Sequence, residues 1–230
     1  KNDKLRMNFF FFKISSLFLR SNGKIKFLIS QKKNTQILDV GCGNNSPFIV
    51  KSLLPLCNYT GVDIQDYNQK KPNLADKYII TSAENFHKEI SDLKNVFDSV
   101  LSSHNIEHCN NPKRTLNAMI SRLKINGELF LSFPSSKTVN FPNRRGCLNY
   151  FDDNTHNSQP PNHEELKQYL LECGFEIIFS TDGYSPLLLR IIGFILEPIS
   201  KLRNLVILGT WEYYRFESII WAKKISNANL

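Results

Sequence analysis

Two acidic residues and two glycines near the start of the chain are spaced as a ligand site requires. In the segment QILDVGCGNNS (36–46), Asp39 lies within the short apolar run 37–40, which is long enough for one buried strand, and Gly41 and Gly43 follow it. Asp63 follows a second apolar run. Glycines allow the backbone to approach a ligand closely, and a carboxylate at the end of the second strand can accept hydrogen bonds from ribose hydroxyls. The pattern predicts a site for a nucleotide-type cofactor.

The turn differs from the one that binds dinucleotides. A dinucleotide site has the pattern G-x-G-x-x-G around a pyrophosphate, but here Ser46 stands at the third glycine position. Asp39 would repel a pyrophosphate, whereas it suits a ligand with a cationic amino group. S-adenosylmethionine (SAM) carries an ammonium, a sulfonium and a ribose, so SAM is the predicted cofactor. Ser46 is also expected to cap the following helix, with Pro47 at its first position.

This segment resembles motif I of the class I SAM-dependent methyltransferases, and the resemblance continues downstream. Residues 97–108 (FDSVLSSHNIEH) and 123–134 (LKINGELFLSFP) are similar to the fourth and fifth strands, with their turns, of the group that includes the ubiquinone-biosynthesis O-methyltransferases. The resemblance covers residues 36–182 and the final strand near 215–224. It implies a Rossmann-like α/β fold, with a seven-stranded, mostly parallel sheet, helices on both faces and an antiparallel last strand.

The resemblance also implies which residues contact the cofactor. Asp63 is expected to hold the ribose hydroxyls with Ile64 against the adenine, while Cys42 is interpreted as a small filler within the turn. The expected cofactor-binding set is Asp39, Gly41, Cys42, Gly43, Asp63, Ile64, Ala83, Glu84 and Ser103.

Three histidines could activate an acceptor. A neutral hydroxyl is a poor nucleophile that needs a positioned base, and histidine titrates near neutral pH. His104, which lies just past the fourth strand, is the first candidate for a catalytic base, followed by His156 and His108. A structural role for any one of them stays open.

Residues 149–156 (NYFDDNTH) resemble the F-Y-D-D-P-T-H segment of sugar and polysaccharide methyltransferases, with Asn154 in place of proline. The resemblance implies that Tyr150, Asp152 and Asp153 bind the substrate. The alternative is an Asx-type turn in which the acidic side chains bond to their own backbone. The predicted function is SAM-dependent methyl transfer to a hydroxyl of a sugar or of a cell-surface-polysaccharide precursor, as in capsule or O-antigen.

Two other functions stay open. One is methylation of a lipid-linked or quinone-like molecule at a membrane surface, and the other is a non-catalytic SAM-binding scaffold. An Asn/Asp-Pro-Pro-Tyr type motif, which is typical of nucleic-acid amino-methyltransferases, does not follow the fourth strand, so no nucleic-acid partner is predicted. No metal is predicted either, because no acidic ligand set is evident near the methyl donor.

The elements that must position these residues alternate between strands and helices, which favours a parallel sheet covered on both faces. Asn162 and Glu165 are spaced as a capping box, and Asn126 can adopt a left-handed turn. Strands are expected over 36–40, 59–64, 78–82, 97–102, 128–133, 175–180 and 215–224, and helices over 47–56, 84–94, 112–124 and 162–173.

The expected organisation is a basic helical segment at 1–33 and a methyltransferase domain at 34–230, with insertions at 134–161 and 184–209. Residues 1–33 contain nine Lys/Arg and one acidic residue, Asp3, which together account for the whole net charge of +8. This segment is expected to cap the sheet or to lie on an anionic surface. The apolar insertion is expected to form two short helices broken near Pro198, serving as a lid, a homodimer interface or a membrane contact.

Five scattered cysteines without a C-x-x-C pair indicate reduced thiols rather than a disulfide framework. We therefore predict a cytoplasmic protein, with peripheral contact at the inner face of the membrane as an open alternative.

Overall fold

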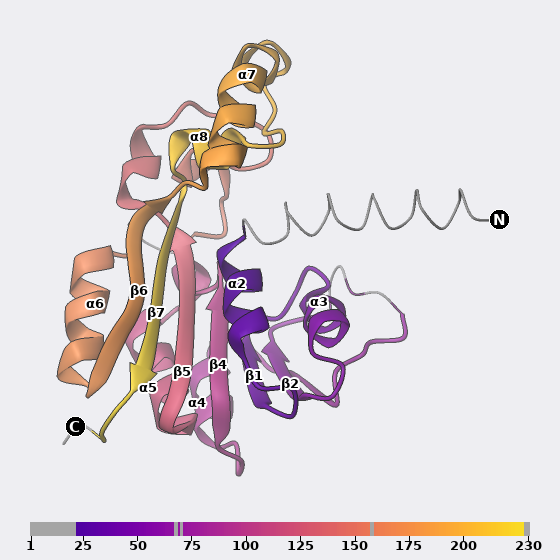
Figure 1. The fold of residues 1–230 in the computed structure, drawn as a ribbon, viewed down its shortest axis with the longest axis vertical. Coiled ribbons are helices and arrows are strands. Elements are labelled where there is room, and N and C mark those ends of the chain that lie inside the picture. The colour runs from indigo at the N-terminus through magenta and orange to yellow at the C-terminus, as the bar shows by residue number, and fades with distance from the viewer. Residues whose placement is uncertain (1–21, 67–68, 70, 157–158, 228–230) are drawn as a thin grey trace.

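A seven-stranded sheet with strand order β3-β2-β1-β4-β5-β7-β6 forms the centre of the molecule (Figure 1). The computed structural model describes residues 22–66, 69, 71–156 and 159–227. Neighbouring strands pair in parallel from β3 to β5, whereas β7 is antiparallel to both β5 and β6. The predicted α/β fold with an antiparallel last strand is thus confirmed. The strands are β1 (Gln36–Val40), β2 (Asn58–Asp63), β3 (Lys77–Ile80), β4 (Phe97–Ser103), β5 (Leu123–Pro134), β6 (Phe175–Tyr184) and β7 (Glu217–Lys224).

Helices cover both faces of the sheet, because each face of the central strands carries apolar side chains. One buried cluster joins the sheet to α4 (Phe86–Ser91), α5 (Pro112–Arg122) and α6 (His163–Glu172). The other cluster joins it to α2 (Gly23–Ser30) and α3 (Ser46–Leu53). Beyond the carboxyl ends of the parallel strands lie α7 (Leu187–Arg203) and α8 (Thr210–Tyr214) (Figure 1). Short 3-10 helices complete this end: η1 (Ile106–His108), η2 (Ser136–Asn140) and η3 (Tyr150–Asp152).

The predicted basic segment 1–33 falls only in part within the described chain, since residues 1–21 lie outside it. Its described part forms α2, whose Phe27 and Leu28 are fully buried. The Phe27 ring packs 5.3 Å from Phe130 and 5.5 Å from Trp221. This part of the segment therefore caps the sheet, which is the first of the two arrangements that we expected.

The apolar insertion differs from the prediction of two short helices. Residues Leu187–Arg203 form one helix that continues through Pro198 and ends at Asn204, which adopts a left-handed conformation. Packing stabilises the continuous helix, because Gly193 lies directly against the backbone of Gly209. A side chain at position 193 would collide with that backbone. None of the described helices combines the length and apolarity needed to cross a membrane.

Two smaller boundaries also differ. Ser46 is not the N-cap of α3; Asn45 occupies that position with a φ of 62°, and the Ser46 hydroxyl instead donates to Asp39. Helix α5 ends at Arg122, and β5 begins directly afterwards. The pairing of β5 with β4 shifts its register between Phe97 and Ser99, and this shift accommodates the predicted left-handed turn at Asn126 (φ 64°). The Asn162 cap is present, with its side chain accepting from the backbone N–H of Glu164 and Glu165.

Candidate active site

One cavity of about 800 Å³ opens at the carboxyl ends of β1, β2 and β4. Its two ends differ in chemistry, and each contains residues that the sequence singled out. The glycine end is formed by Gly41, Asp63, Ile64 and Ala83. The histidine end is formed by His104, His108, His156, Trp211 and Phe216.

The turn after β1 can be made only with glycine at its first position. Gly41 has a φ of 76°, which L side chains rarely adopt, and a Cβ there would collide with the side chain of Asn105. Asn105 itself lies in the cavity wall. The exposed backbone of the turn thus faces the space that Asp63 borders.

Asp39 lies beneath this turn and is fully buried. Its Oδ2 accepts hydrogen bonds from Tyr59 (2.7 Å) and Ser46, and lies 3.8 Å from Nζ of Lys24. Its Oδ1 has no hydrogen-bond partner among the described residues. One carboxylate oxygen therefore fixes the side chain beneath the turn.

The two carboxylate oxygens of Asp63, at the end of β2, also differ in their partners. Its Oδ1 accepts from the backbone N–H of Ile64 at 2.7 Å, and its buried Oδ2 has no partner among the described residues. Burial raises the pKa of Asp63. The Ile64 side chain is 49% exposed at the same edge of the cavity.

The other residues expected to contact the cofactor lie outside the cavity wall. Cys42 is fully buried with its Sγ facing Gly61, where a Cβ would come within 2.6 Å, and burial raises the pKa of its thiol. Ser103 shares a 2.9 Å hydrogen bond with Ser132. Asp39, Gly43 and Glu84 are likewise absent from the described wall of the cavity.

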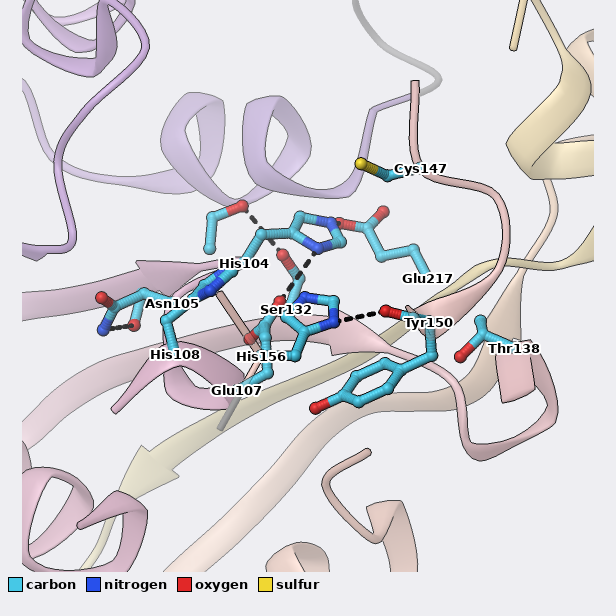
Figure 2. A network of polar contacts seen from close by, with 12 residues as sticks. His104, Asn105, Glu107, His108, Ser132, Thr138, Cys147, Tyr150, His156 and Glu217 are labelled. Carbon is cyan, nitrogen blue, oxygen red and sulfur yellow. Dashed lines mark hydrogen bonds and ion pairs between the residues drawn. The ribbon is translucent and has the colours of Figure 1, made fainter. Parts of the chain in front are cut away.

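His104 directly follows β4 and is held between two carboxylates (Figure 2). Its Nδ1 lies 3.4 Å from Oε1 of Glu107, and its Nε2 lies 3.2 Å from Oε1 of Glu217. Burial lowers the pKa of His104, but the two carboxylates outweigh burial and raise it to about 10. The residue also has a left-handed backbone with a φ of 49°, uncommon for a non-glycine residue.

His156 stacks on Tyr150, with ring centroids 4.0 Å apart. Its Nδ1 lies 2.6 Å from the carbonyl oxygen of Tyr150, which can only accept, so Nδ1 carries a proton and Nε2 holds the lone pair (Figure 2). Burial lowers the pKa of His156, which keeps the ring neutral. Tyr150 is fully buried and supports the histidine through its ring and backbone.

His108 has the same proton arrangement. Its Nδ1 lies 3.3 Å from the carbonyl oxygen of Thr155 and 2.9 Å from that residue's hydroxyl, so Nδ1 donates. The Thr155 hydroxyl in turn lies 2.6 Å from Asp153, which borders the cavity. The rings of His108 and His156 are 4.7 Å apart.

Asp152 does not line the cavity, contrary to its predicted role in substrate binding. Its carboxylate accepts from the backbone N–H of Arg144, Leu148 and Asn149 at 2.8–3.0 Å, and from the Asn143 side chain at 2.8 Å. The carboxylate is therefore occupied in closing its own loop, which corresponds to the Asx-type alternative.

Several residues at the histidine end have no local signal for their position. Glu107 is adjacent to His108 in the sequence, but nothing there indicates that it faces His104. Glu217, Trp211 and Phe216 arrive from the other end of the chain, and the rings of Trp211 and Phe216 stack at 4.6 Å. No local pattern could have found them, because only the antiparallel return of β7 brings them to His104.

A seven-stranded sheet with one antiparallel strand, and a cavity lined by a glycine turn and a buried acid, define the class I methyltransferase fold. Comparison with known proteins agrees: residues 17–179 match the methyltransferase domain family, which is most of the chain. The chain therefore belongs to the methyltransferase domain family.

Individual relatives are more distant. An uncharacterised protein of Methanocaldococcus jannaschii is 32% identical over 107 residues; the match covers 44% of this chain and 28% of that protein. Among solved structures, plantazolicin methyltransferase BpumL, crystallised with a pentazolic desmethylPZN analogue and SAH, superposes with a TM-score of 0.58 at 20% identity, over 91% of this chain and 84% of that one.

A chain from the complex between the Haloferax volcanii methyltransferase activator Trm112 and a methyltransferase superposes with a TM-score of 0.57 at 12% identity, over 87% of this chain and 88% of that one. At these identities the two solved structures establish the fold.

The cofactor is SAM, and the glycine end fits it. Oδ2 of Asp63 and Oδ1 of Asp39 are buried and accept no hydrogen bond from the described residues, and Asp63 borders the cavity beside the Gly41 turn. Ile64 and Ala83 offer apolar surface to an adenine ring at the same end. When bound, the cofactor supplies an electrophilic methyl group on its sulfonium.

Proposed function

We propose that this protein transfers a methyl group from SAM to a hydroxyl of a sugar or of a cell-surface-polysaccharide precursor. The observation that carries the proposal is the continuity of one cavity, which Asp63 and the Gly41 turn border at its glycine end and His108 and His156 border at its histidine end. The protein must align the hydroxyl with the methyl group, exclude water and remove the hydroxyl proton.

The geometry supports His156, rather than His104, as the histidine that acts on the hydroxyl. Both ring nitrogens of His104 face carboxylates. Nε2 of His156 carries a lone pair, and the ring is fixed through Nδ1 and by stacking on Tyr150. We assign His104 the role of a positioning residue that joins η1 to β7.

A sugar fits the remaining wall of the histidine end. The stacked rings of Trp211 and Phe216 present an aromatic surface, and Asp153 and Thr155 border the same space with polar groups. Aromatic faces beside a few placed polar groups are typical of sites for small molecules.

The alternative acceptor is a lipid-linked or quinone-like molecule, with α7 as a contact to an anionic membrane. Seven apolar side chains of α7 are exposed: Leu187, Leu188, Ile191, Phe194, Ile195, Ile199 and Leu202. Arg190, Lys201 and Arg203 lie on the same helix. None of the residues 187–209 lines the cavity, which disfavours a lid. The other interpretation of this exposed face of α7 is a homodimer interface.

Plantazolicin methyltransferase acts on a different kind of molecule, so azole-containing peptides belong among the acceptors to be compared. The test is incubation of the purified full chain with SAM and separate panels of nucleotide sugars, lipid-linked glycans, quinols and azole peptides, followed by mass spectrometry. We expect a gain of one methyl group on a sugar hydroxyl. Methylation confined to another panel would contradict the sugar proposal, and SAM binding without methylation of any panel would favour the scaffold alternative.

A further inference from the structure

Three side chains at the histidine end converge as metal ligands do. Glu107 and His108 belong to η1, and His156 follows η3. Each offers one ligand atom, and these atoms all lie within 4.8 Å of one another. Bonds of about 2.0–2.2 Å to a shared ion would bring such atoms to roughly 3–4 Å, which is a small adjustment for side chains.

Glu107 is a buried acid with few partners for its carboxylate. Its exposed fraction is 1%, and neither of its carboxylate oxygens accepts a hydrogen bond within the described part of the chain. His104 lies 3.4 Å from one of these oxygens, but the same ring also serves Glu217. The ion pair with His104 leaves Oε2 of Glu107 buried without a partner among the described residues. A second cation beside Glu107 would satisfy that oxygen.

The two histidines are oriented as metal ligands usually are. Metal-bound imidazoles typically donate their other ring N–H to a carbonyl, carboxylate or water, which fixes the ring and directs its lone pair at the ion. His156 donates Nδ1–H to the carbonyl of Tyr150, and His108 donates to that of Thr155. In both rings the lone pair is therefore on Nε2.

We propose that Glu107, His108 and His156 bind one divalent transition-metal ion, of which Zn²⁺ is the representative case. Two imidazoles and one carboxylate suit Zn²⁺ and its neighbours better than Mg²⁺ or Ca²⁺, which prefer oxygen ligands. Three protein ligands leave a position for an oxygen ligand from the cavity. This proposal replaces the expectation from the sequence that no metal is bound.

This inference deepens, and rests on, the proposed hydroxyl methylation. A hydroxyl oxygen on the ion loses its proton to water more readily, because the positive charge stabilises the alkoxide. The new bond joins that oxygen to the methyl carbon while the carbon–sulfur bond breaks, and the sulfur keeps the electron pair. His156 then acts as a ligand instead of accepting the proton itself.

The test measures the metal directly, without SAM or acceptor. Untagged full chain is stripped with a chelator and titrated with Zn²⁺ by calorimetry and with Co²⁺ by visible absorption. We expect one ion per chain and ligand-field bands from Co²⁺. The variants E107Q and H156N should each weaken binding by about tenfold or more. His87, in the wall of the same cavity but outside the cluster, provides the control H87N, which should bind as the wild type does.

Two results would overturn the proposal: no saturable binding of either ion to folded wild type, or equal binding by wild type, E107Q and H156N. Circular dichroism identifies a variant that fails to fold; in that case H108N, at a partly exposed position, takes its place. Failure of metal binding leaves the proposed methyl transfer standing with His156 as a direct base. Failure of methyl transfer with intact metal binding overturns the acceptor assignment alone.

Discussion

Arg144 and Glu197, which are 53 residues apart, form a bidentate ion pair with N–O distances of 2.6 and 2.8 Å. Arg144 is 5% exposed and also donates to Ser200 at 2.7 Å. One partner belongs to the loop after β5 and the other to α7. The two segments expected as separate insertions are therefore one structural unit above the cavity.

Removing Arg144 should destabilise that unit strongly. R144M leaves Glu197 without its cation and should reduce the free energy of unfolding by about 3–5 kcal/mol, as for other broken buried pairs. Urea denaturation gives the value. The neighbouring exposed Arg145 provides the control R145M, which should change stability little. Equal effects of the two variants would contradict the importance of this pair.

The same pair predicts a dependence on pH. Hydrogen bonding to Arg144 lowers the pKa of Glu197 below its unfolded value. A lowered pKa contributes stability that is present above the unfolded pKa of about 4.3 and is lost as the pH falls through the folded pKa. The stability difference between wild type and E197Q should therefore shrink below about pH 4.5. A difference that is constant from pH 7 to pH 3 would refute this linkage.

Asp63 should be essential for SAM affinity. D63A removes a charge-assisted acceptor at the border of the cavity, at a cost of about 1.5–3 kcal/mol, which corresponds to roughly a 10- to 150-fold rise in Kd. Calorimetry with SAM measures it. Asp66 is exposed and does not line the cavity, so D66A should bind SAM normally. Unchanged affinity in D63A would remove the basis for the cofactor site.

His156 should affect turnover rather than SAM binding. H156N lowers the rate of methyl transfer by about 10²-fold or more, while the SAM Kd stays nearly constant, because the residue lies at the histidine end. His163 begins α6 outside the cavity wall, so H163N in folded protein serves as the control. Full turnover in H156N with the true acceptor would exclude His156 from hydroxyl activation.

The exposed face of α7 should decide membrane attachment. Wild type should co-sediment with anionic vesicles at low salt and less so at high salt, since Lys/Arg near an anionic surface contribute about 1 kcal/mol each. The double variant F194S/I195S should lose this binding. Leu171, exposed on α6, provides the control L171S. Concentration-dependent dimers without vesicle binding would instead support pairing of two copies through α7.

The sheet, the glycine turn and the position of Asp63 could be predicted from the sequence, because these depend on local signals. Apolar runs specify strands, Gly41 specifies a backbone conformation that other residues rarely adopt, and a strand end fixes where an acid lies. The single helix α7 was missed because Pro198 is a local signal for a break, whereas packing of Gly193 on Gly209 keeps the helix intact.

The tertiary structure alone decided the chemistry of the histidine end. His104 was the first candidate for the base because of its place after β4, but β7 brings Glu217 to its Nε2 across 113 residues of sequence. Glu107 and His156 meet only because the loop after η3 folds over η1. A histidine's proton state, and its choice between base and metal ligand, depends on neighbours that are distant in sequence, so periodicity and spacing could not reveal it.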